Sequence, residues 1–246
     1  MRKFGLIGYP LGHSFSKRFF SAKFESENID ARYDLYELQN LEMFADLKLT
    51  PDLCGLNVTI PYKEKVISYL DTLDDTAQTI GAVNVIKFLH TSEGKLILKG
   101  YNSDAIGFRN SLLPLLAKHH TKALILGTGG ASKAVKYVLD NLKIKSVFVS
   151  RNPSEGMISY QQIDENVLQN FKLIINASPV GTFPNVNDCP DIPYQFLDTT
   201  HLLFDVVYNP AETLFMKKGK EQGAMVCNGE DMLTEQAKAA WEIWNS

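Results

Sequence analysis

The fold is decided by an apolar run and the glycine-rich turn that follows it, Ala123-Leu124-Ile125-Leu126-Gly127-Thr128-Gly129-Gly130-Ala131-Ser132. The run predicts a buried strand over 123–126, and the pattern after the turn predicts a helix over 132–142. This order is typical of a dinucleotide-binding βα unit, because glycine permits close approach of a pyrophosphate to the free N–H groups of the helix start. We therefore expect cofactor contacts at Gly127, Gly129, Gly130 and Ala131. A glycine turn that binds nothing is the alternative.

The end of the next predicted strand indicates which nucleotide binds. Ser150-Arg151-Asn152 stand near the offset at which NAD-binding chains carry an acidic residue for the ribose 2′-hydroxyl. No acid is present there, and the Arg151 guanidinium suits a 2′-phosphate. The sequence favours NADP over NAD, and a solvated arginine at a strand end is the alternative.

On both sides of this turn, apolar runs alternate with helical patterns along the whole chain, which predicts an α/β fold with mostly parallel sheets. The predicted strands are 3–9, 31–37, 53–59, 83–88, 95–99, 123–126, 146–150, 172–176, 202–207 and 225–227. The predicted helices are 16–27, 63–70, 76–80, 105–118, 132–142, 212–221 and 230–244, with an irregular stretch over 153–170. We expect an N-terminal α/β substrate-binding domain over 1–103, completed by the returning C-terminal helix of 230–246, and a Rossmann-like NADP-binding domain over 104–229.

Composition excludes several classes of protein. The 246 residues are 45% hydrophobic and 22% charged, and 25 Lys+Arg against 28 Asp+Glu give a formal charge of -3. These values argue against a nucleic-acid partner and against disorder. Three separated cysteines give no disulfide framework or metal site, and no apolar run is long enough for a membrane span. We expect a cytoplasmic protein with no membrane and no metal, either a monomer or a homodimer.

Polar residues cluster at or just beyond predicted strands, the edge where α/β sheets bind ligands. Together with the glycine turn, these clusters make the chain resemble the shikimate dehydrogenase family along essentially its whole length. The resemblance is carried by Ser14-x-Ser16, Asn57-Val58-Thr59-x-Pro61-x-Lys63, Gly81-Ala82-Val83-Asn84, Asn102-x-Asp104, Gly127-x-Gly129-Gly130-Ala131, Asn176-Ala177-Ser178-Pro179-x-Gly181, Asp205-Val206-Val207-Tyr208-Asn209-Pro210 and Gly229-x-x-Met232-Leu233-x-x-Gln236-Ala237.

The resemblance implies reversible NADPH-dependent reduction of 3-dehydroshikimate to shikimate, in the chorismate pathway to aromatic amino acids. It implies that Lys63 and Asp104 act at the reacting oxygen and also bind substrate. The other implied substrate-binding residues are Ser14 and Ser16, which would hold the carboxylate, and Thr59, Asn84, Tyr208 and Gln236. The implied cofactor-binding residues are Gly127, Gly129, Gly130, Ala131, Ser150, Arg151, Asn152, Val206 and Gly229.

The residue chemistry agrees with this implied reaction. Hydride delivery to a ketone builds negative charge on oxygen, so a cationic proton donor such as Lys63 lowers the barrier. A carboxylate such as Asp104 favours the charged lysine and accepts a hydrogen bond from a ring hydroxyl.

Structural alternatives stand beside these roles. Ser14 and Asp104 each precede a predicted helix and are candidates for N-caps, and Lys63 is a candidate for a solvated charge. His13 is more typical of a structural residue, and Trp241 and Trp244 are spaced for packing of the last helix.

Two other activities stay open. One is a paralogue that oxidises quinate as well as shikimate, with NAD; the other is a non-catalytic NADP-binding sensor on the same fold. Ser103 stands where the family commonly has threonine, and Asp231 where glycine is common. Glu155 follows Arg151 where the family usually has a second basic residue, which weakens the preference for NADP.

Overall fold

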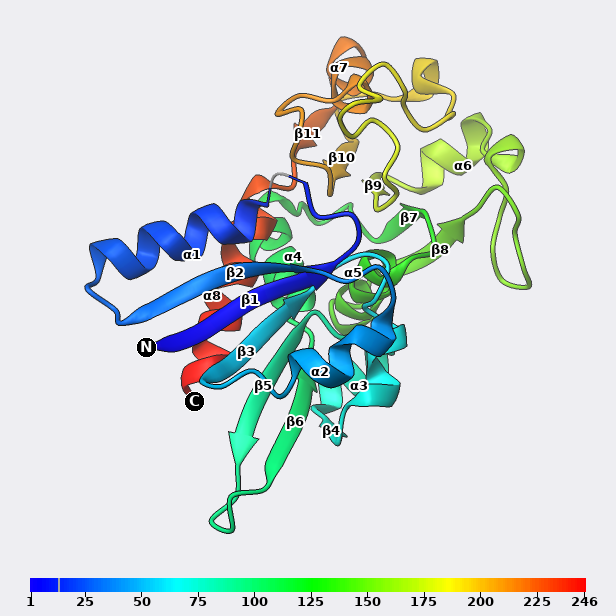
Figure 1. Ribbon diagram of the computed structural model, residues 1–246. Helices are drawn as coiled ribbons and strands as arrows, with labels where there is room; N and C mark the ends of the chain where they lie inside the picture. Colours follow the sequence, from blue (N-terminus) through cyan, green and yellow to red (C-terminus); the bar gives the residue numbers. More distant parts are fainter. Residues whose placement is uncertain (13) are drawn as a thin grey trace. The chain divides into compact units, whose positions relative to one another are not determined.

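The computed structural model describes residues 1–12 and 14–246, which form two compact units (Figure 1). Unit 1 comprises Met1–Ile106 and Gln236–Ser246, and unit 2 comprises Gly107–Glu235. The borders fall inside α4 (Asp104–Leu112) and α8 (Glu230–Asn245), so each of these helices belongs partly to both units. That 1–103 with 230–246 binds the substrate and 104–229 binds NADP stays a prediction.

Unit 1 is built on a mixed sheet with the strand order β2-β1-β3-β5-β6-β4. Its strands are β1 (Arg2–Gly8), β2 (Ala31–Glu37), β3 (Leu53–Val58), β4 (Thr72–Leu73), β5 (Val85–His90) and β6 (Leu96–Tyr101). β1 runs parallel to β2 and β3, whereas β5 runs antiparallel to β3 and β6. β2 therefore forms one edge of this sheet.

Short helices connect these strands, and capping residues set several of their ends. They are α1 (Phe15–Ser26), η1 (Leu41–Met43), α2 (Phe44–Leu47), η2 (Lys65–Tyr69) and α3 (Asp75–Ile80), where η marks a 3₁₀ helix. Asp74 caps the start of α3, and Gly81 ends it at φ 69°, in the left-handed region that glycine adopts without strain. The predicted helix over 63–70 is wrong in type, since only the 3₁₀ turn η2 forms there.

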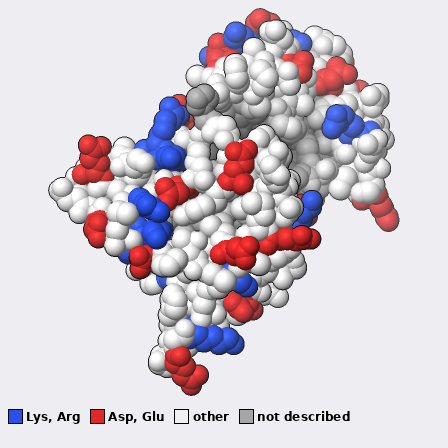
Figure 2. Space-filling model, in the orientation of Figure 1, with Lys and Arg blue, Asp and Glu red and all other residues white. Residues whose placement is uncertain are grey.

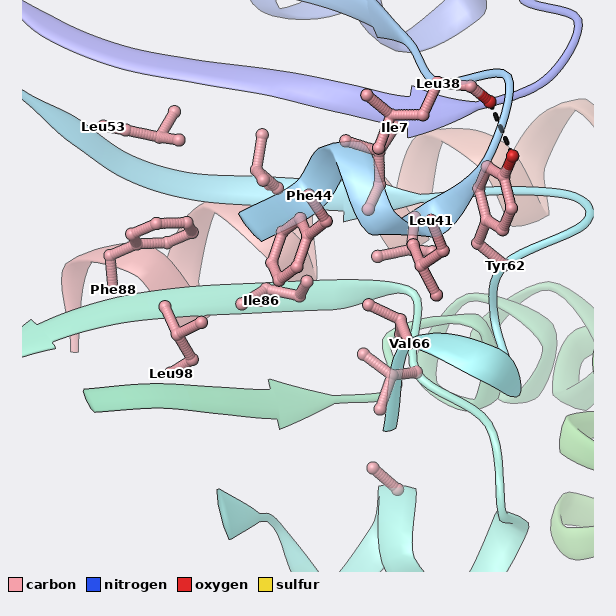
Figure 3. Packing of buried hydrophobic residues seen from close by; sticks show 14 residues of the cluster. Ile7, Leu38, Leu41, Phe44, Leu53, Tyr62, Val66, Ile86, Phe88 and Leu98 are labelled. Atoms are coloured by element: carbon pink, nitrogen blue, oxygen red, sulfur yellow. Dashed lines mark hydrogen bonds between the residues drawn. The ribbon is translucent and has the colours of Figure 1, made fainter. Parts of the chain in front are cut away.

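Two apolar cores cover the two faces of this sheet. On one face, Phe44 and Leu41 from the η1–α2 segment pack against Ile86 and Leu98, and the hydroxyl of Tyr62 donates to Leu38 O (Figure 3). On the other face α1 and α8 pack on β1 and β2. There the indole of Trp244 covers Gly55, where any Cβ would lie 2.3 Å from the ring nitrogen. The predicted packing role of Trp241 and Trp244 is confirmed.

Unit 2 is built on a parallel sheet with the strand order β11-β10-β9-β7-β8. Its strands are β7 (Lys122–Leu126), β8 (Lys145–Val149), β9 (Leu173–Asn176), β10 (Leu202–Asp205) and β11 (Met225–Cys227). Its further helices are η3 (Leu113–Leu115), α5 (Gly130–Asn141), η4 (Tyr160–Gln162), α6 (Glu165–Asn170), η5 (Tyr194–Phe196) and α7 (Leu214–Glu221). The two units together confirm the predicted α/β class.

Two predictions for unit 2 need correction. The helix expected over 105–118 gives way to η3 after Leu112, because Pro114 cannot continue α-helical hydrogen bonding. The stretch expected to be irregular over 153–170 contains η4 and α6, and Asp164 caps α6 by accepting from Val167 N at 2.8 Å. Within residues 1–12 and 14–246, no helix combines the length and the apolar character needed to cross a bilayer.

Candidate active site

A turn after β3 delivers Lys63 to the end of the unit 1 sheet. Thr59 donates its N–H to Ile7 O at 2.9 Å, and Tyr62 N–H donates to Thr59 O at 2.9 Å, which closes the turn. The carbonyl of Lys63 then accepts from Val83 N at 2.7 Å. The backbone before Lys63 is therefore tied to β1 through Thr59, and the Lys63 carbonyl is tied to Val83, two residues before β5.

Lys63 and Asp104 form a close ion pair. The distance from Lys63 Nζ to Asp104 Oδ2 is 2.6 Å, and the side chains are 18% and 8% exposed. Asp104 is the first residue of α4, and its carboxylate does not cap that helix. Asn102 Oδ1 instead accepts from Ala105 N at 3.2 Å. The N-cap alternative for Asp104 and the solvated-charge alternative for Lys63 are both wrong.

The buried amide of Asn84 holds the other carboxylate oxygen. Asn84 Nδ2 donates to Asp104 Oδ1 and to Ser103 Oγ, both at 2.9 Å, and Ser103 N donates to Asn84 Oδ1 at 2.6 Å. Each oxygen of Asp104 thus has its own partner, and the carboxylate is fixed. The Lys63 ammonium has three protons, so two remain to be donated to other acceptors.

Gln236 joins the same group of side chains from α8. Its Oε1 lies 3.4 Å from both Asn84 Nδ2 and Ser103 Oγ, and it accepts from the Ser103 hydroxyl, because both Asn84 Nδ2 protons are already donated at 2.9 Å. The amide oxygen therefore faces the network, and the amide nitrogen faces away from these two donors. Lys63, Asn84, Asp104 and Gln236, four of the predicted site residues, are brought together by the fold of unit 1.

The other predicted substrate residues of unit 1 have contacts of their own. Ser14 caps α1, since its Oγ accepts from Lys17 N at 3.2 Å, so the cap interpretation is confirmed while its role toward a ligand stays a prediction. Ser16 makes a hydrogen bond to Tyr33, whose pKa is raised well above its ordinary value by burial and lowered to a lesser extent by that bond. His13, between Gly12 and Ser14, lies outside the described residues.

Tyr33 and Asn57 are buried and join this network, although neither is among the predicted site residues. Tyr33 OH donates to Asn57 Oδ1 at 2.7 Å, and Asn57 Nδ2 donates to Asn84 O at 3.3 Å. They link Ser16 to the backbone of Asn84. The available signal was Asn57 itself, a polar residue within the otherwise apolar run of β3.

In unit 2 the predicted glycine turn leaves space beside the start of α5. Gly127 has φ 111°, and a Cβ there would lie 3.1 Å from Ala177 O. Gly129 stands at the start of α5 with nothing within 4 Å of a Cβ built on it. Ser132, at the position where dinucleotide-binding turns have glycine or alanine, is fully buried and donates to Gly129 O at 2.6 Å. The helix start is open, and the Ser132 hydroxyl is satisfied internally.

The predicted ribose-phosphate residues follow β8. Asn152 N donates to Ser150 Oγ at 3.2 Å, and Arg151 is exposed. The cationic Arg151 lowers the pKa of Tyr160, although burial raises that pKa by more. Arg151 therefore lies within electrostatic range of Tyr160 and keeps its guanidinium on the surface of unit 2.

The carboxyl end of β10 carries a buried acid. Asp205 accepts from Asn176 Nδ2 at 3.0 Å, from Val207 N at 3.0 Å and from Thr213 Oγ1 at 2.6 Å. Burial raises the pKa of Asp205 to about 6, against these three hydrogen bonds, which lower it.

Val206 and Gly229, two predicted cofactor residues, are packed against one another. A Cβ on Gly229 would lie 2.1 Å from Val206 O, so only glycine fits at this position. Tyr208 lies half-buried in unit 2, two residues beyond Val206. Within the two described stretches of chain, no group of three or more His, Cys, Asp or Glu side chains is placed to hold a metal ion.

These features define a class of protein: an α/β protein with a Rossmann-type nucleotide turn and a lysine–aspartate pair suited to proton transfer. Residues 6–86 match the family described as the shikimate dehydrogenase substrate binding domain. The chain belongs to the shikimate dehydrogenase family, as relatives 36% and 37% identical over nearly its whole length show.

Full-length relatives agree with this assignment. The NADP(+) shikimate dehydrogenase of Methanosphaera stadtmanae is 36% identical over 98% of this chain and 90% of its own length. That of Clostridium beijerinckii is 37% identical over 99% of this chain and 92% of its own. The Thermus thermophilus enzyme, solved with NADP(H) and shikimate, superimposes with a TM-score of 0.85 at 28% identity, covering 99% of this chain and 93% of that one.

Proposed function

We propose that this chain is an NADP-dependent shikimate dehydrogenase, which reduces 3-dehydroshikimate to shikimate and catalyses the reverse oxidation. The observation that carries the proposal is the Lys63–Asp104 pair at 2.6 Å, with the second carboxylate oxygen held by Asn84. A non-catalytic nucleotide sensor has no need of a desolvated acid–base pair fixed by a buried amide. Membership of the family and the names of the full-length relatives support the same activity.

Lys63 is the proton donor in this proposal. Reduction of a ketone leaves negative charge on its oxygen, and the Lys63 ammonium stabilises that oxygen and then transfers a proton to it. In the direction of oxidation, the same nitrogen accepts the hydroxyl proton. Asp104 keeps the lysine in place, because one of its oxygens stays on Nζ while Asn84 prevents rotation of the carboxylate.

The remaining substrate residues orient the ring. The amide nitrogen of Gln236 is available to a ligand oxygen because Oε1 accepts from Ser103 Oγ. Ser14 keeps its hydroxyl proton for a carboxylate, since its oxygen accepts from Lys17 N. Ser16, Thr59 and Tyr208 complete the proposed set of substrate residues.

The residues of unit 2 fit NADP. The open start of α5 at Gly129, with Gly127, Gly130 and Ala131 around it, suits a pyrophosphate, because among the described residues nothing lies within 4 Å of a Cβ built on Gly129. Ser150, Arg151 and Asn152 suit the phosphorylated ribose, and Val206 and Gly229 complete the proposed nucleotide site. Bound NADPH supplies the hydride.

A spectrophotometric assay tests the proposal. Purified protein is mixed with shikimate or quinate and with NADP or NAD in parallel, and formation of reduced nicotinamide is followed. We expect turnover of shikimate with NADP to exceed that of the other three combinations. A larger rate with quinate and NAD points to the paralogue activity, and nucleotide binding without turnover of either acid contradicts the proposal.

A further inference from the structure

Four strands of the unit 2 sheet end in one row. Val149 of β8, Leu126 of β7, Asn176 of β9 and Asp205 of β10 are in register with one another. The glycine turn follows β7, and Arg151 follows β8. Because β9 and β10 lie on the other side of β7 from β8, the loops after them lie where the second half of a dinucleotide extends from the proposed pyrophosphate site.

Two buried polar residues, Asn176 and Asp205, occupy this row on β9 and β10. Acidic side chains are spread over the visible face of the molecule (Figure 2), where water solvates them, whereas Asp205 is fully buried. Burial of a polar group lowers stability unless its hydrogen bonds are made. Core packing does not explain the pair, since Leu126 and Val149 fill the same row with apolar side chains.

Each residue of the pair turns the chain that follows it. Asn176 Oδ1 accepts from Ser178 N at 3.2 Å, and Asp205 Oδ1 accepts from Val207 N at 3.0 Å. Both contacts reach the amide two residues ahead, which is the Asx turn that asparagine and aspartate form. Asn176 Nδ2 also donates to Asp205 Oδ1 at 3.0 Å, so the two turns are tied together. The loops after β9 and β10 therefore leave the sheet in directions that are fixed relative to each other.

Both loops contact residues of the proposed nucleotide site. A Cβ on Gly127 would lie 3.1 Å from Ala177 O, so the loop after β9 borders the glycine turn. In the loop after β10, Val206 N donates to the carbonyl oxygen of Asn176 at 2.9 Å, and Val206 O would lie 2.1 Å from a Cβ on Gly229. A shift of either loop thus changes the space beside Gly127 and Gly229.

The two oxygens of Asp205 serve different parts of unit 2. Oδ1 holds the two turns, whereas Oδ2 accepts from Thr213 Oγ1 at 2.6 Å. Thr213 caps α7, since its Oγ1 accepts from Met216 N at 3.3 Å. Burial raises the pKa of Asp205 to about 6, so above about pH 7 the carboxylate is ionised and both oxygens accept. Substitution can therefore separate the loops from the helix cap.

We propose that Asn176 and Asp205 are positioning residues that act through the loops after β9 and β10 on the nicotinamide half of the nucleotide. This role rests on the proposed function, which requires the nucleotide. Hydride transfer tolerates little displacement, since a shift of about 1 Å can lower a rate about 10²-fold. Loosening these loops should therefore lower kcat and leave binding of the adenosine half, at the glycine turn and Arg151, unchanged.

Asp205→Ala removes the acceptor of both Asn176 Nδ2 and Val207 N. At about pH 7.5 it should lower kcat for shikimate oxidation about 10- to 100-fold and raise the Kd for NADP about tenfold. The Kd for adenosine 2′,5′-bisphosphate, which lacks the nicotinamide, should change less than about twofold. Asn176→Ala breaks the tie but leaves Val207 N its acceptor, so it should show the same pattern with smaller changes. It decides the question if Asp205→Ala does not fold.

Two further variants separate positioning from stability. Asp205→Asn should keep kcat within about threefold of the natural chain, because its amide oxygen can accept both bonds that Oδ1 accepts. Thr213→Val, the matched control, removes the Oδ2 contact and the α7 cap, so it should lower the melting temperature and leave kcat and both Kd values unchanged.

Natural turnover in Asp205→Ala overturns the positioning role. So does a loss of kcat in Thr213→Val equal to that in Asp205→Ala, or in Asp205→Asn equal to that in Asp205→Ala. A natural chain that binds NADP without turning over shikimate contradicts the proposed function alone. The positioning role then stands if Asp205→Ala weakens binding of NADP and not of adenosine 2′,5′-bisphosphate, and it fails if both bind more weakly by the same factor.

Discussion

The two sites of the molecule are built in opposite ways. In unit 1, Lys63, Asp104 and Asn84 already hold one another in a buried hydrogen-bonded network. In unit 2, the turn at Gly129 presents bare backbone, and Arg151 reaches into solvent. The proposed acid–base pair is therefore positioned by the fold itself, whereas the proposed nucleotide turn leaves space for a ligand. Substitutions in unit 1 should therefore reduce activity when they remove contacts, and substitutions at the turn of unit 2 should reduce nucleotide binding when they add atoms.

The largest effect is expected at the pair itself. Lys63→Ala should lower kcat by about 10²–10⁴-fold with little change in the Kd for NADPH, because the proton donor is lost while the nucleotide turn is intact. Steady-state kinetics and a fluorescence titration measure the two quantities, and Lys65→Ala, an exposed neighbour, is the matched control. Asp104→Asn should also lower turnover, and the double variant should lose less than the sum of the two. Turnover near that of the natural chain in Lys63→Ala would contradict the assigned role.

Gly129 and Gly229 of unit 2 lack a side chain for different reasons: we expect Gly129 to leave room for a ligand, and Gly229 to allow close backbone packing. Gly229→Ala should lower the free energy of unfolding by about 1–3 kcal/mol, because its Cβ would lie 2.1 Å from Val206 O. Gly129→Ala should leave stability nearly unchanged, since a Cβ there meets nothing within 4 Å, yet should weaken NADP binding. Thermal unfolding and NADP titration of both variants check these two expectations. A destabilised Gly129→Ala variant together with a Gly229→Ala variant of unchanged stability would contradict them.

Arg151 tests the preference for the phosphorylated nucleotide. Arg151→Ala should weaken NADP binding by about tenfold and leave NAD binding nearly unchanged, because only NADP has a 2′-phosphate to bind a guanidinium. The measurement is a Kd for each nucleotide on both proteins. Equal losses for NADP and NAD would show that Arg151 shapes the site in general.

The two serines of the first βα turn test whether unit 1 also contains residues with one structural and one binding role. Ser14→Ala should lower stability by about 1 kcal/mol through loss of the α1 cap and should raise the KM for shikimate, whereas Ser16→Ala should raise KM without the cap effect. The kcat of both variants should change little, because a carboxylate is bound alike in ground and transition states. A lower melting temperature with KM unchanged in Ser14→Ala would leave that residue a cap only.

The smallest effect is a pH dependence that should arise in unit 2. Burial, together with the nearby His119 and His201, lowers the pKa of His120 below 6.5, against a hydrogen bond to Thr200 O that raises it. As the pH falls below about 6.5, the unfolded chain therefore binds a proton that the folded chain does not, and stability declines. His120 Nδ1 accepts a hydrogen bond from Ala117 N at 2.9 Å. His120→Asn should make stability decline less as the pH falls, because the asparagine amide oxygen can still accept that bond. The control is His90→Asn, at an exposed histidine of unit 1, which should leave the decline in stability unchanged. Melting curves from about pH 8 to about pH 5.5 compare the two variants.

Residue patterns predict the parts of this fold that rest on local rules. The strand and turn at Gly127, the cap at Ser14 and the last helix follow from apolar periodicity, glycine and capping chemistry. The segment over 63–70 has a helical pattern, yet it forms only η2 between the turn at Tyr62 and the pairing of Asp71 N with Leu98 O. That contact joins distant parts of the chain, and spacing within a short window cannot reveal it.

The site was predictable where polar residues stand at strand ends. Lys63, Asn84 and Asp104 do so, and the family resemblance implies that Lys63 and Asp104 act as a pair. It does not imply the hydrogen bond from Asn84 to Asp104. Tyr33 was missed because it lies in the middle of a strand, where an aromatic residue is typical of a core. Its hydroxyl donates to Asn57 on β3, a strand that does not pair with β2, and spacing within β2 cannot reveal that contact.

The place of Trp244 has a consequence for synthesis on the ribosome. Its indole fills the slot above Gly55, and Ala237 and Ala240 complete the core around Phe4 and Tyr33, so unit 1 closes only with the last segment, Gln236–Ser246. Unit 2 is continuous in the chain and is complete before that segment is translated. Translation proceeds at about 5–20 residues per second, so the aromatic face of β1 and α1 stays uncovered for on the order of ten seconds until Gln236–Ser246 has been made. During that interval the nascent chain exposes an apolar aromatic surface, the kind of surface that makes incompletely folded chains prone to aggregate.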